Sequence, residues 1–355
     1  MNRRAGAAAL ACAVFSAALA CLAPAAGADD ERLFQFEDRR IVESSGLAAS
    51  AVHDGVVYTH NDSDDGPYVY AVDGEGKTVA TLTLPDAPAR DWEAIAPGPG
   101  PDGKPSLFVG DIGDNITGWD EIRVMRFAEP DKLADGEVDY KLFRFRYADS
   151  KSRNAEALLV HPKTGRLYVV SKNDQGGAVY RAPETLKTGS INILRKVADA
   201  PATVTDGAFT LDGEHAVLRG YFYADIVDPG RDWAKVDKLQ APWGMQGESV
   251  AATRDAEAMM FGSEGLGSSV YRVELPEKIG ESARPSPSPS KSSGTKKKPA
   301  KSASPGPEKK DSEDSKDSKD GDSHEGLPFV DGRTVAGVGA VSLGVLILVL
   351  FVRRG

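Results

Sequence analysis

The sequence has almost no cysteine. It contains two cysteines among 355 residues, Cys12 and Cys21, and both lie within the first 28 residues. That segment begins with Arg3 and Arg4, continues as an apolar run and ends in Ala-Gly-Ala, which is typical of a secretory signal peptide that is removed. We therefore predict a mature protein without cysteine, which excludes disulfides, thiol nucleophiles and zinc sites with cysteine ligands.

Clustered positive charge is also lacking in the main part of the chain. The net charge is −10, and because residues 1–28, 284–326 and 327–355 each contribute +2, residues 29–283 carry −16. Nucleic-acid binding needs cations clustered against phosphates. We therefore expect no nucleic-acid partner.

Long uncharged runs are scarce, and the one near the C-terminus predicts a membrane anchor. Residues 334–352 are 19 uncharged residues followed by Arg353 and Arg354. As a helix they would span about 28 Å, close to one hydrocarbon core, and the arginines place the C-terminus in the cytoplasm. Residues 283–326, rich in Pro, Ser, Lys and Asp, contain no aliphatic side chain larger than alanine and predict a disordered linker.

These signals predict a single-pass protein of the cell membrane with its N-terminal domain outside, held to the membrane by its C-terminal helix. An alternative is attachment to the cell wall, because "LPFVDG" at 327–332 resembles a sortase sorting signal, with Val330 and Asp331 in place of the Thr-Gly pair that is cut. The expected segments are a signal peptide (1–28), an extracellular body (29–282), a linker (283–326), a juxtamembrane segment (327–333), a transmembrane helix (334–352) and a cytoplasmic tail (353–355).

Helical periodicity is lacking in the body, which reads as short β-branched and aromatic runs broken by turns. Five pentapeptides recur within it, with starts separated by 48, 63, 50 and 42 residues: "ESSGL" (43–47), "DWEAI" (91–95), "NAEAL" (154–158), "VTDGA" (204–208) and "QGESV" (246–250). Such a period in an all-β chain is typical of propeller blades of four strands each. We predict five blades, with six as an alternative if the insertion before residue 154 hides a degenerate unit, and two unclosed sandwiches as a further possibility.

Each repeat continues with further predicted strands, and only the fifth lacks a fourth strand. Residues 32–43 at the start of the body can supply it. An N-terminal strand that completes the last blade would close the ring and remove a free edge.

The first strand of each blade would line the central channel. The recurring acidic or serine position would then place Ser45, Glu93, Glu156, Asp206 and Glu248 around one axis. Several carboxylates in a narrow ring cannot all remain ionised without a cation, a basic partner or raised pKa values. The candidate catalytic carboxylates are Glu93, Glu156 and Glu248.

Further polar residues at the strand ends are expected near the mouth of the channel. The predicted ligand-binding set is Glu43, His60, Asn61, Asp62, Asp91, Trp92, Asp111, Asp114, Asn115 and Lys172, with Asp62, Asp64, Asp111 and Asp114 as candidate metal ligands. The oxygen-rich turns "NDSDDG" (61–66) and "GDIGDN" (110–115) favour Ca²⁺ if a metal is bound. Three interpretations stay open: carboxylates that hold the blades together, a divalent-cation site, or a carboxylate pair for acid–base hydrolysis of a sugar or ester.

The motifs "ESSGLAAS", "VVYTHNDSDDGP", "ARDWEAIA" and "LFVGDIGDN" together resemble a bacterial family of exported WD40-like propeller proteins. The chain is more distantly similar to the β-propeller phytases and their esterase-like relatives, a resemblance that would imply calcium dependence and six blades. The multi-aspartate, Lys/Arg-rich phosphate site that a phytase resemblance would imply is not recognisable in this sequence.

The sequence therefore predicts a surface-displayed acidic β-propeller that binds an extracellular ligand or protein partner, with structural calcium as an additional possibility. The alternative is an extracellular hydrolase that acts on glycan or phosphoester through the channel carboxylates.

Overall fold

The computed structural model describes residues 31–62, 65–242 and 246–284. The predicted signal peptide, juxtamembrane segment, transmembrane helix and cytoplasmic tail lie outside these residues, as does the linker apart from Ala283 and Arg284. Within the described ranges, no helix has the length and apolar character needed to cross a membrane.

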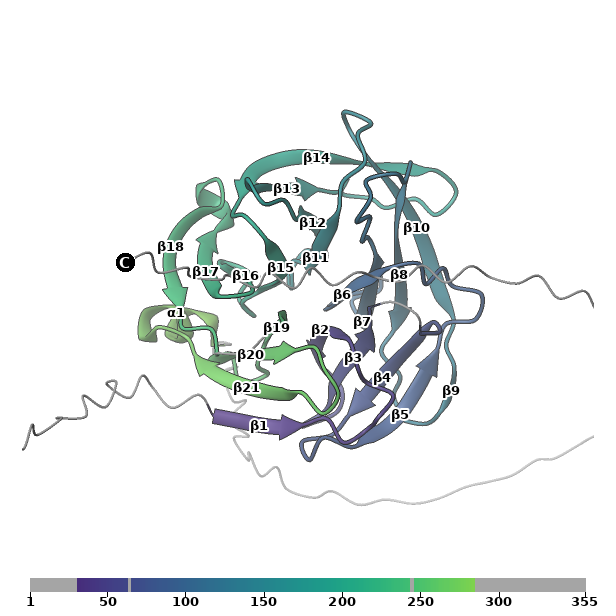
Figure 1. Ribbon diagram of the computed structural model, residues 1–355, viewed down its shortest axis with the longest axis vertical. Coiled ribbons are helices and arrows are strands. Elements are labelled where there is room, and N and C mark those ends of the chain that lie inside the picture. Colours follow the sequence, from purple (N-terminus) through teal and green to yellow (C-terminus); the bar gives the residue numbers. More distant parts are fainter. Residues whose placement is uncertain (1–30, 63–64, 243–245, 285–355) are drawn as a thin grey trace, which may run out of the picture. The chain divides into compact units, whose positions relative to one another are not determined.

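The regular structure of the described chain is almost entirely β-strand (Figure 1). The strands fall into five sets of four, of which the second and third are hydrogen-bonded into one eight-stranded sheet. The first strands are β2 (Ser44–Ala49), β6 (Trp92–Pro99), β11 (Ala155–Val160), β15 (Val204–Phe209) and β19 (Gly247–Ala252). The second strands are β3 (Val57–Asn61), β7 (Pro105–Asp111), β12 (Leu167–Ser171), β16 (Ala216–Gly220) and β20 (Ala258–Ser263). The third strands are β4 (Tyr68–Val72), β8 (Ile122–Ala128), β13 (Gly177–Arg181), β17 (Tyr223–Asp228) and β21 (Ser269–Glu274). The fourth strands are β5 (Thr78–Thr83), β10 (Tyr140–Tyr147), β14 (Ile191–Ala200), β18 (Ala234–Leu239) and β1 (Glu31–Gln35).

The five first strands pack side by side in the cyclic order β2, β6, β11, β15, β19 and back to β2, as Figure 1 shows at the centre of the ribbon. They are buried along nearly their whole length, because each has a sheet neighbour on one edge and other first strands on its faces. Their sequences combine aliphatic residues with Ala, Gly and Ser, which suits close packing near an axis. This all-β architecture of four-stranded sheets agrees with the predicted β-propeller.

Five hydrophobic clusters fill the spaces between neighbouring sheets. One of them, between the first two sheets, contains Trp92, whose indole Nε1 donates to the Pro88 carbonyl at 2.7 Å. Burial of one such large apolar side chain stabilises the fold by about 1.5–3 kcal/mol. The sheets are therefore held together mainly by their faces, and side chains of outer strands alternate between buried and more exposed positions, as in β10.

The N-terminal strand β1 pairs antiparallel with β21, the third strand of the last sheet. Phe34 of β1 and Phe36 just after it are buried against Leu47, Val57 and Val270, between the last sheet and the first. The strand expected from residues 32–43 thus forms at their beginning and completes the last sheet. A short helix, α1 (Glu277–Ala283), follows this sheet.

The insertion before residue 154 connects three sheets. Its two-residue strand β9 (Gly136–Glu137) pairs parallel with β5 of the first sheet, and β10 pairs antiparallel with β8 and parallel with β14 of the third sheet. Asn192 holds the β10–β14 junction, because its side-chain amide donates to the carbonyls of Arg144 and Lys187. The insertion accounts for the long second spacing between repeats.

Candidate functional site

Every first strand carries an irregularity in its pairing with the second strand, at the same place in each sheet. The extra residue of the bulge is Ser45, Glu93, Glu156, Thr205 and Glu248 in the five sheets. A β-bulge adds one residue to a strand and re-aims its side chain. The repeated acidic or serine position is therefore a structural one, and it lies at the end where the first strands begin.

The fourth sheet differs from the sequence alignment by one residue. Asp206 pairs directly with Arg219, and Thr205 is the bulge residue. The matching pentapeptide thus starts at Thr203 instead of Val204. Asp206 lies deeper, where its carboxylate accepts hydrogen bonds from the backbone N–H groups of Gly207 and Val250 at 2.7 Å each.

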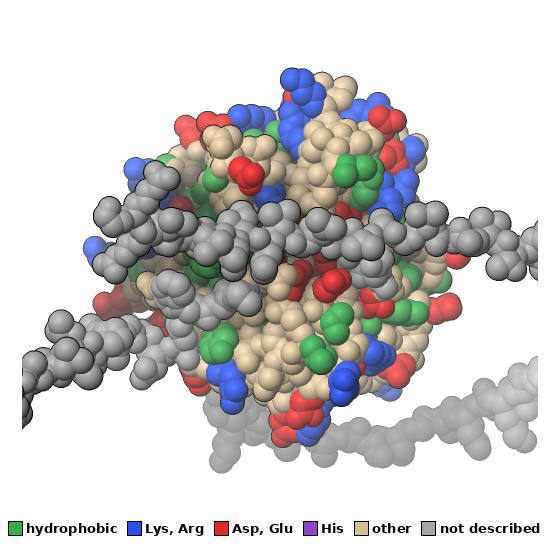
Figure 2. Space-filling view, in the orientation of Figure 1, with side chains coloured by type: hydrophobic (Ala, Val, Ile, Leu, Met, Phe, Trp, Pro, Cys, Tyr) green, Lys and Arg blue, Asp and Glu red, His purple; other side chains and the backbone are tan. Residues whose placement is uncertain are grey.

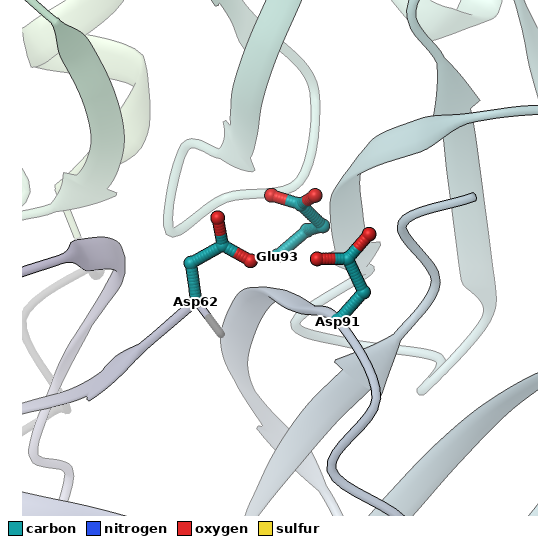
Figure 3. Close-up of side chains that lie close together, drawn as sticks. All are labelled: Asp62, Asp91 and Glu93. Carbon is teal, nitrogen blue, oxygen red and sulfur yellow. The ribbon is translucent and has the colours of Figure 1, made fainter. Parts of the chain in front are cut away.

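Three carboxyl groups meet at this end of the channel. One oxygen each of Asp62, Asp91 and Glu93 lies within 4.8 Å of the others, and their side chains point toward one another in Figure 3. Asp62 follows the end of β3, Asp91 precedes β6, and Glu93 is the bulge residue of β6. The cluster is thus built where the first and second sheets meet.

These carboxyl groups have few hydrogen-bond donors. Glu93 is only 5% exposed, and the charged groups that affect it, Glu156, Asp62 and Asp91, are all carboxyl groups. The Oδ1 atom of Asp62 is buried without a hydrogen-bond partner among the described residues. Burial raises the pKa of Asp62 to about 10, and a hydrogen bond to Asp91 and the negative charges of Asp91, Glu264 and Glu156 act in the same direction.

The pKa values of the other two members move the same way. Burial, followed by the charges of Glu156, Asp62 and Asp91, raises the pKa of Glu93 well above its usual value. Burial also raises the pKa of Asp91, although its hydrogen bond with Asp62 opposes this. A cation between the three groups would replace the missing donors and favour their ionised forms.

A lysine partly neutralises the neighbouring carboxylates. The Nζ atom of Lys172 lies 3.2 Å from Oε1 of Glu156 and donates to the hydroxyl of Tyr221 at 2.9 Å. Burial alone would lower the pKa of Lys172, but the charge of Glu156, the hydrogen bond to Tyr221 and the charge of Glu248 raise it overall. Asn154 also donates to Oε1 of Glu156, at 2.9 Å.

The remaining carboxyl groups come from the last sheet. Glu264, just after β20, accepts hydrogen bonds from Ser45 Oγ and from the side-chain amide of Gln246, both at 3.1 Å. Burial raises the pKa of Glu248 to about 8, and the charges of Glu264 and Glu156 add to this, whereas Lys172 opposes it. We call the set Asp62, Asp91, Glu93, Glu156, Lys172, Glu248 and Glu264 the acidic mouth.

Arg219 lies deeper than the acidic mouth and links the fourth sheet to the fifth. Its guanidinium is buried and donates to the carbonyls of Ser249 and of Gly262, the latter at 2.6 Å. Burial lowers its pKa to about 10, whereas the charges of Glu248 and Asp206 favour its ionised form. Because the guanidinium donates to backbone carbonyls, among the described residues it forms no hydrogen bond with a carboxylate of the acidic mouth. Carboxyl groups therefore still outnumber basic groups there.

Several of the expected binding residues serve the fold. Asp111 is fully buried and forms an ion pair with Arg90 at 2.7 Å, and its Oδ1 accepts the backbone N–H of Arg90. Asp114 accepts the backbone N–H groups of Gly118 and Trp119 at 2.8 Å each. Neither carboxylate belongs to the cluster of Asp62, Asp91 and Glu93.

Of the other residues expected at the mouth, some stabilise the fold and one lies at the rim of the carboxyl cluster. Trp92 and His60 are buried side by side, with ring centroids 5.9 Å apart, and burial lowers the pKa of His60 to about 4. Asn61 accepts the backbone N–H groups of Val42 and Glu43 at 3.0 Å. Asn115 is exposed and donates to Asp91 at 3.2 Å, so it belongs to the rim of the cluster, and Asp64 lies outside the described residues.

The structure adds Tyr221 and Glu264 to the residues expected from the sequence. Both follow the last residue of a second strand, as do Asp62 and Lys172. The position after the second strand is therefore a second recurring feature, and comparing it across the repeats would have identified both residues.

Exposed hydrophobic side chains surround the acidic mouth. Ile116, Phe222 and Leu266 are 85%, 79% and 58% exposed, and they are the most exposed large hydrophobic residues of the described chain. Each lies in a loop that joins a second strand to a third, which is the end of the sheets where the acidic mouth lies. Figure 2 shows acidic side chains near the middle of one face of the molecule, with hydrophobic side chains exposed near them.

Comparison with known proteins gives little beyond this geometry. No family model matches the chain, and no curated protein matches it significantly. A solved structure described as the crystal structure of a nidogen/laminin complex is similar with a TM-score of 0.40 and 17% identity, over 63% of this chain and 72% of that chain. The fold assignment rests on the strand pairing and packing described above.

Proposed function

We propose that this chain is a binding module of the five-bladed β-propeller type, displayed at the cell surface by its C-terminal segment. The blade count is supported by the cyclic packing of the five first strands and by the pairing of β1 with β21. The chain between β8 and residue 154 supports five blades instead of six, because it contributes β10, the fourth strand of the second sheet, and β9, which extends the first sheet. Surface display is inferred from the sequence of the N- and C-terminal segments alone.

The ligand site of this module is the acidic mouth, and its first ligand is a calcium ion held by Asp62, Asp91 and Glu93. The observation that carries this proposal is the convergence of three carboxyl groups, one of them 95% buried. Asn115 donates to Asp91, but Oδ1 of Asp62 is buried without a hydrogen-bond partner among the described residues. An all-oxygen set of this kind is suited to Ca²⁺, with water or a ligand completing the coordination. The set differs from the one expected from the sequence by including Asp91 and Glu93 in place of Asp64, Asp111 and Asp114.

A protein partner fits the surroundings of this site better than a small molecule does. The exposed side chains of Ile116, Phe222 and Leu266 offer apolar contacts around a charged centre. Aromatic and aliphatic anchors around a polar centre are common in protein interfaces. Calcium would neutralise the carboxylates of the acidic mouth and bind an oxygen atom of the partner.

Calorimetric titration of the full-length protein with CaCl₂, after treatment with EDTA, tests the calcium site. We expect saturable binding of one ion, a higher melting temperature with calcium, and a loss of affinity of at least tenfold in Asp62→Asn and in Glu93→Gln. Asp102→Asn, which changes an exposed carboxylate in a turn, is the matched control and should bind as the wild type does. Equal melting temperatures in EDTA and in millimolar calcium, with no binding heat, would sink the calcium proposal.

A second candidate function is hydrolysis, and one pair of carboxyl groups favours it. Burial and the charge of neighbouring Glu156 raise the pKa of Glu93, whereas Glu156 is paired with Lys172, so the two carboxyl groups would serve as acid and base. Glycan and phosphoester panels tested with wild type and Glu156→Gln address this candidate. An inert wild type would leave the binding module as the remaining function.

A further inference from the structure

The end of the channel opposite the acidic mouth is apolar and incompletely filled. A cavity of about 220 Å³ lies there, and all five first strands line it, with residues such as Leu47, Ile95, Leu159, Phe209 and Val250. The packing leaves this space because small residues, among them Ala96, Gly207, Ala208 and Ala251, occupy neighbouring positions of the lining. An apolar cavity of this kind loses dispersion contacts when empty and gains them when an apolar group enters.

A positive charge stands at the edge of this cavity. Arg254 lines it and also lines a second apolar cavity of about 210 Å³, between the last sheet and the first, which includes Phe34, Val57 and Met260. Both cavities also share Ala49 and Ser50. Arg254 therefore combines access to solvent with contact to two apolar surfaces.

The present partner of Arg254 is weakly held. Its Nη1 lies 2.7 Å from Oδ1 of Asp54, but the side chains are 47% and 93% exposed. Ion pairs this exposed contribute little to stability, so an incoming carboxylate can replace Asp54 at small cost. The nearby carboxylate of Glu129 does not compete, because it accepts hydrogen bonds from Ser50 and from the backbone N–H groups of Ala51 and Val52.

We propose that this end of the channel binds an amphipathic carboxylate, with its apolar tail in the cavity and its carboxylate on the guanidinium of Arg254. If each methylene fills about the volume of a water molecule, about 30 Å³, the cavity accepts roughly seven carbon atoms. An unbranched fatty acid of medium length therefore fits in size and in charge. This site is independent of the acidic mouth and uses none of its residues.

The test is a calorimetric titration of the full-length protein in phosphatidylcholine nanodiscs, with empty nanodiscs as the blank. Octanoate should bind at least tenfold more tightly than acetate, which lacks the tail, and than octylamine, which carries the opposite charge. Arg254→Ala should lower octanoate affinity at least tenfold and leave 1-octanol binding unchanged, whereas Ala208→Phe, which fills the cavity, should weaken both. Arg144→Ala removes an arginine of similar exposure from an ion pair with Glu121 elsewhere and should have no effect.

Two results would overturn the proposal. One is octanoate that binds no better than acetate or octylamine. The other is octanoate affinity that stays the same in Arg254→Ala, because the carboxylate would then have another partner or none. The ligand series and Arg254→Ala decide the question even if Ala208→Phe does not fold.

Discussion

The amine of Lys172 lies 3.2 Å from the carboxylate of Glu156, and this ion pair joins the second strand of the third sheet to its bulged first strand. Glu156 also influences Asp62, Asp91, Glu93, Glu248 and Glu264 electrostatically. Lys172 therefore offsets the charge of Glu156, and its own charge opposes the raised pKa values of Glu248 and Glu264.

Replacing Lys172 by methionine should destabilise the protein by about 2–4 kcal/mol, because it leaves a buried carboxylate without its cation. The same change should raise calcium affinity, since a competing positive charge is removed. Urea unfolding in EDTA and calcium titration measure the two effects. Lys163→Met, at an exposed position near the opposite end of the channel, is the control, and equal stability of Lys172→Met and Lys163→Met would show that the pair contributes nothing.

Gly113→Ala should disrupt the calcium site with little effect on the fold. An added Cβ would lie 2.4 Å from Oε1 of Glu93 and 2.5 Å from Oδ2 of Asp91, so both carboxylates must move. We expect at least a tenfold loss of calcium affinity by calorimetry. Gly118→Ala, whose added Cβ comes no closer than 3.7 Å to Ile116, should keep wild-type affinity. Unchanged affinity in Gly113→Ala would place the ion elsewhere.

Stability should fall in acid partly through Asp38, in the loop after β1. Hydrogen bonds from the Arg40 side chain lower the pKa of Asp38 to about 2. A carboxylate with a lowered pKa stabilises the fold above its ordinary pKa near 4, and this contribution disappears as the pH falls from about 4 to 2. Because the side chain of Arg40 is largely exposed to solvent, we expect ionised Asp38 to contribute about 1 kcal/mol to the free energy of unfolding.

Urea unfolding of wild type and Asp38→Asn at pH 7 and pH 3 measures this contribution. The difference between the two proteins should be about 1 kcal/mol at pH 7 and clearly smaller at pH 3. A difference that does not change with pH would mean that the ion pair is not its source.

Phe34→Ala should weaken closure of the ring. Its side chain is buried between the last sheet and the first, and removal of a buried phenylalanine costs about 3–5 kcal/mol. Amide hydrogen exchange should become faster in β1 and β21 while β11 and β12 stay protected. Leu33→Ala, at a partly exposed neighbour, should have a smaller effect, and uniform acceleration across all sheets would contradict a local role for β1.

The repeat in the sequence was sufficient to predict the strand sets, the N-terminal strand and the acidic ring. The prediction worked because the bulge in each first strand needs a similar local sequence, so position and side-chain type recur together. It was wrong by one residue in the fourth sheet, where Thr205 occupies the bulge and Asp206 follows it. Two adjacent polar residues cannot be ordered without knowing which of them pairs with the second strand.

The candidate site was predicted less completely. Asp62, Asp91 and Glu93 were all among the candidates, but the sequence grouped Asp62 with Asp111 and Asp114 because they share oxygen-rich turns. Both turns lie beside Asp91, but the carboxylates of Asp111 and Asp114 are used by Arg90 and by backbone N–H groups instead of joining the cluster. Glu264 was missed because its role depends on contacts with Ser45, which lies 219 residues away.

The pairing of β1 with β21 has a consequence for how the protein folds. Gln35 donates to the carbonyl of Gly267, which lies 232 residues further along the chain. Contacts of such long sequence separation form slowly, because the intervening chain must first be ordered. During synthesis the first strand is made long before its partner, so it must stay unpaired and soluble until the last sheet emerges. The strand begins with two charged residues, Glu31 and Arg32. Charge on an unpaired strand discourages association with other chains, so these residues help to keep the strand soluble until β21 is made.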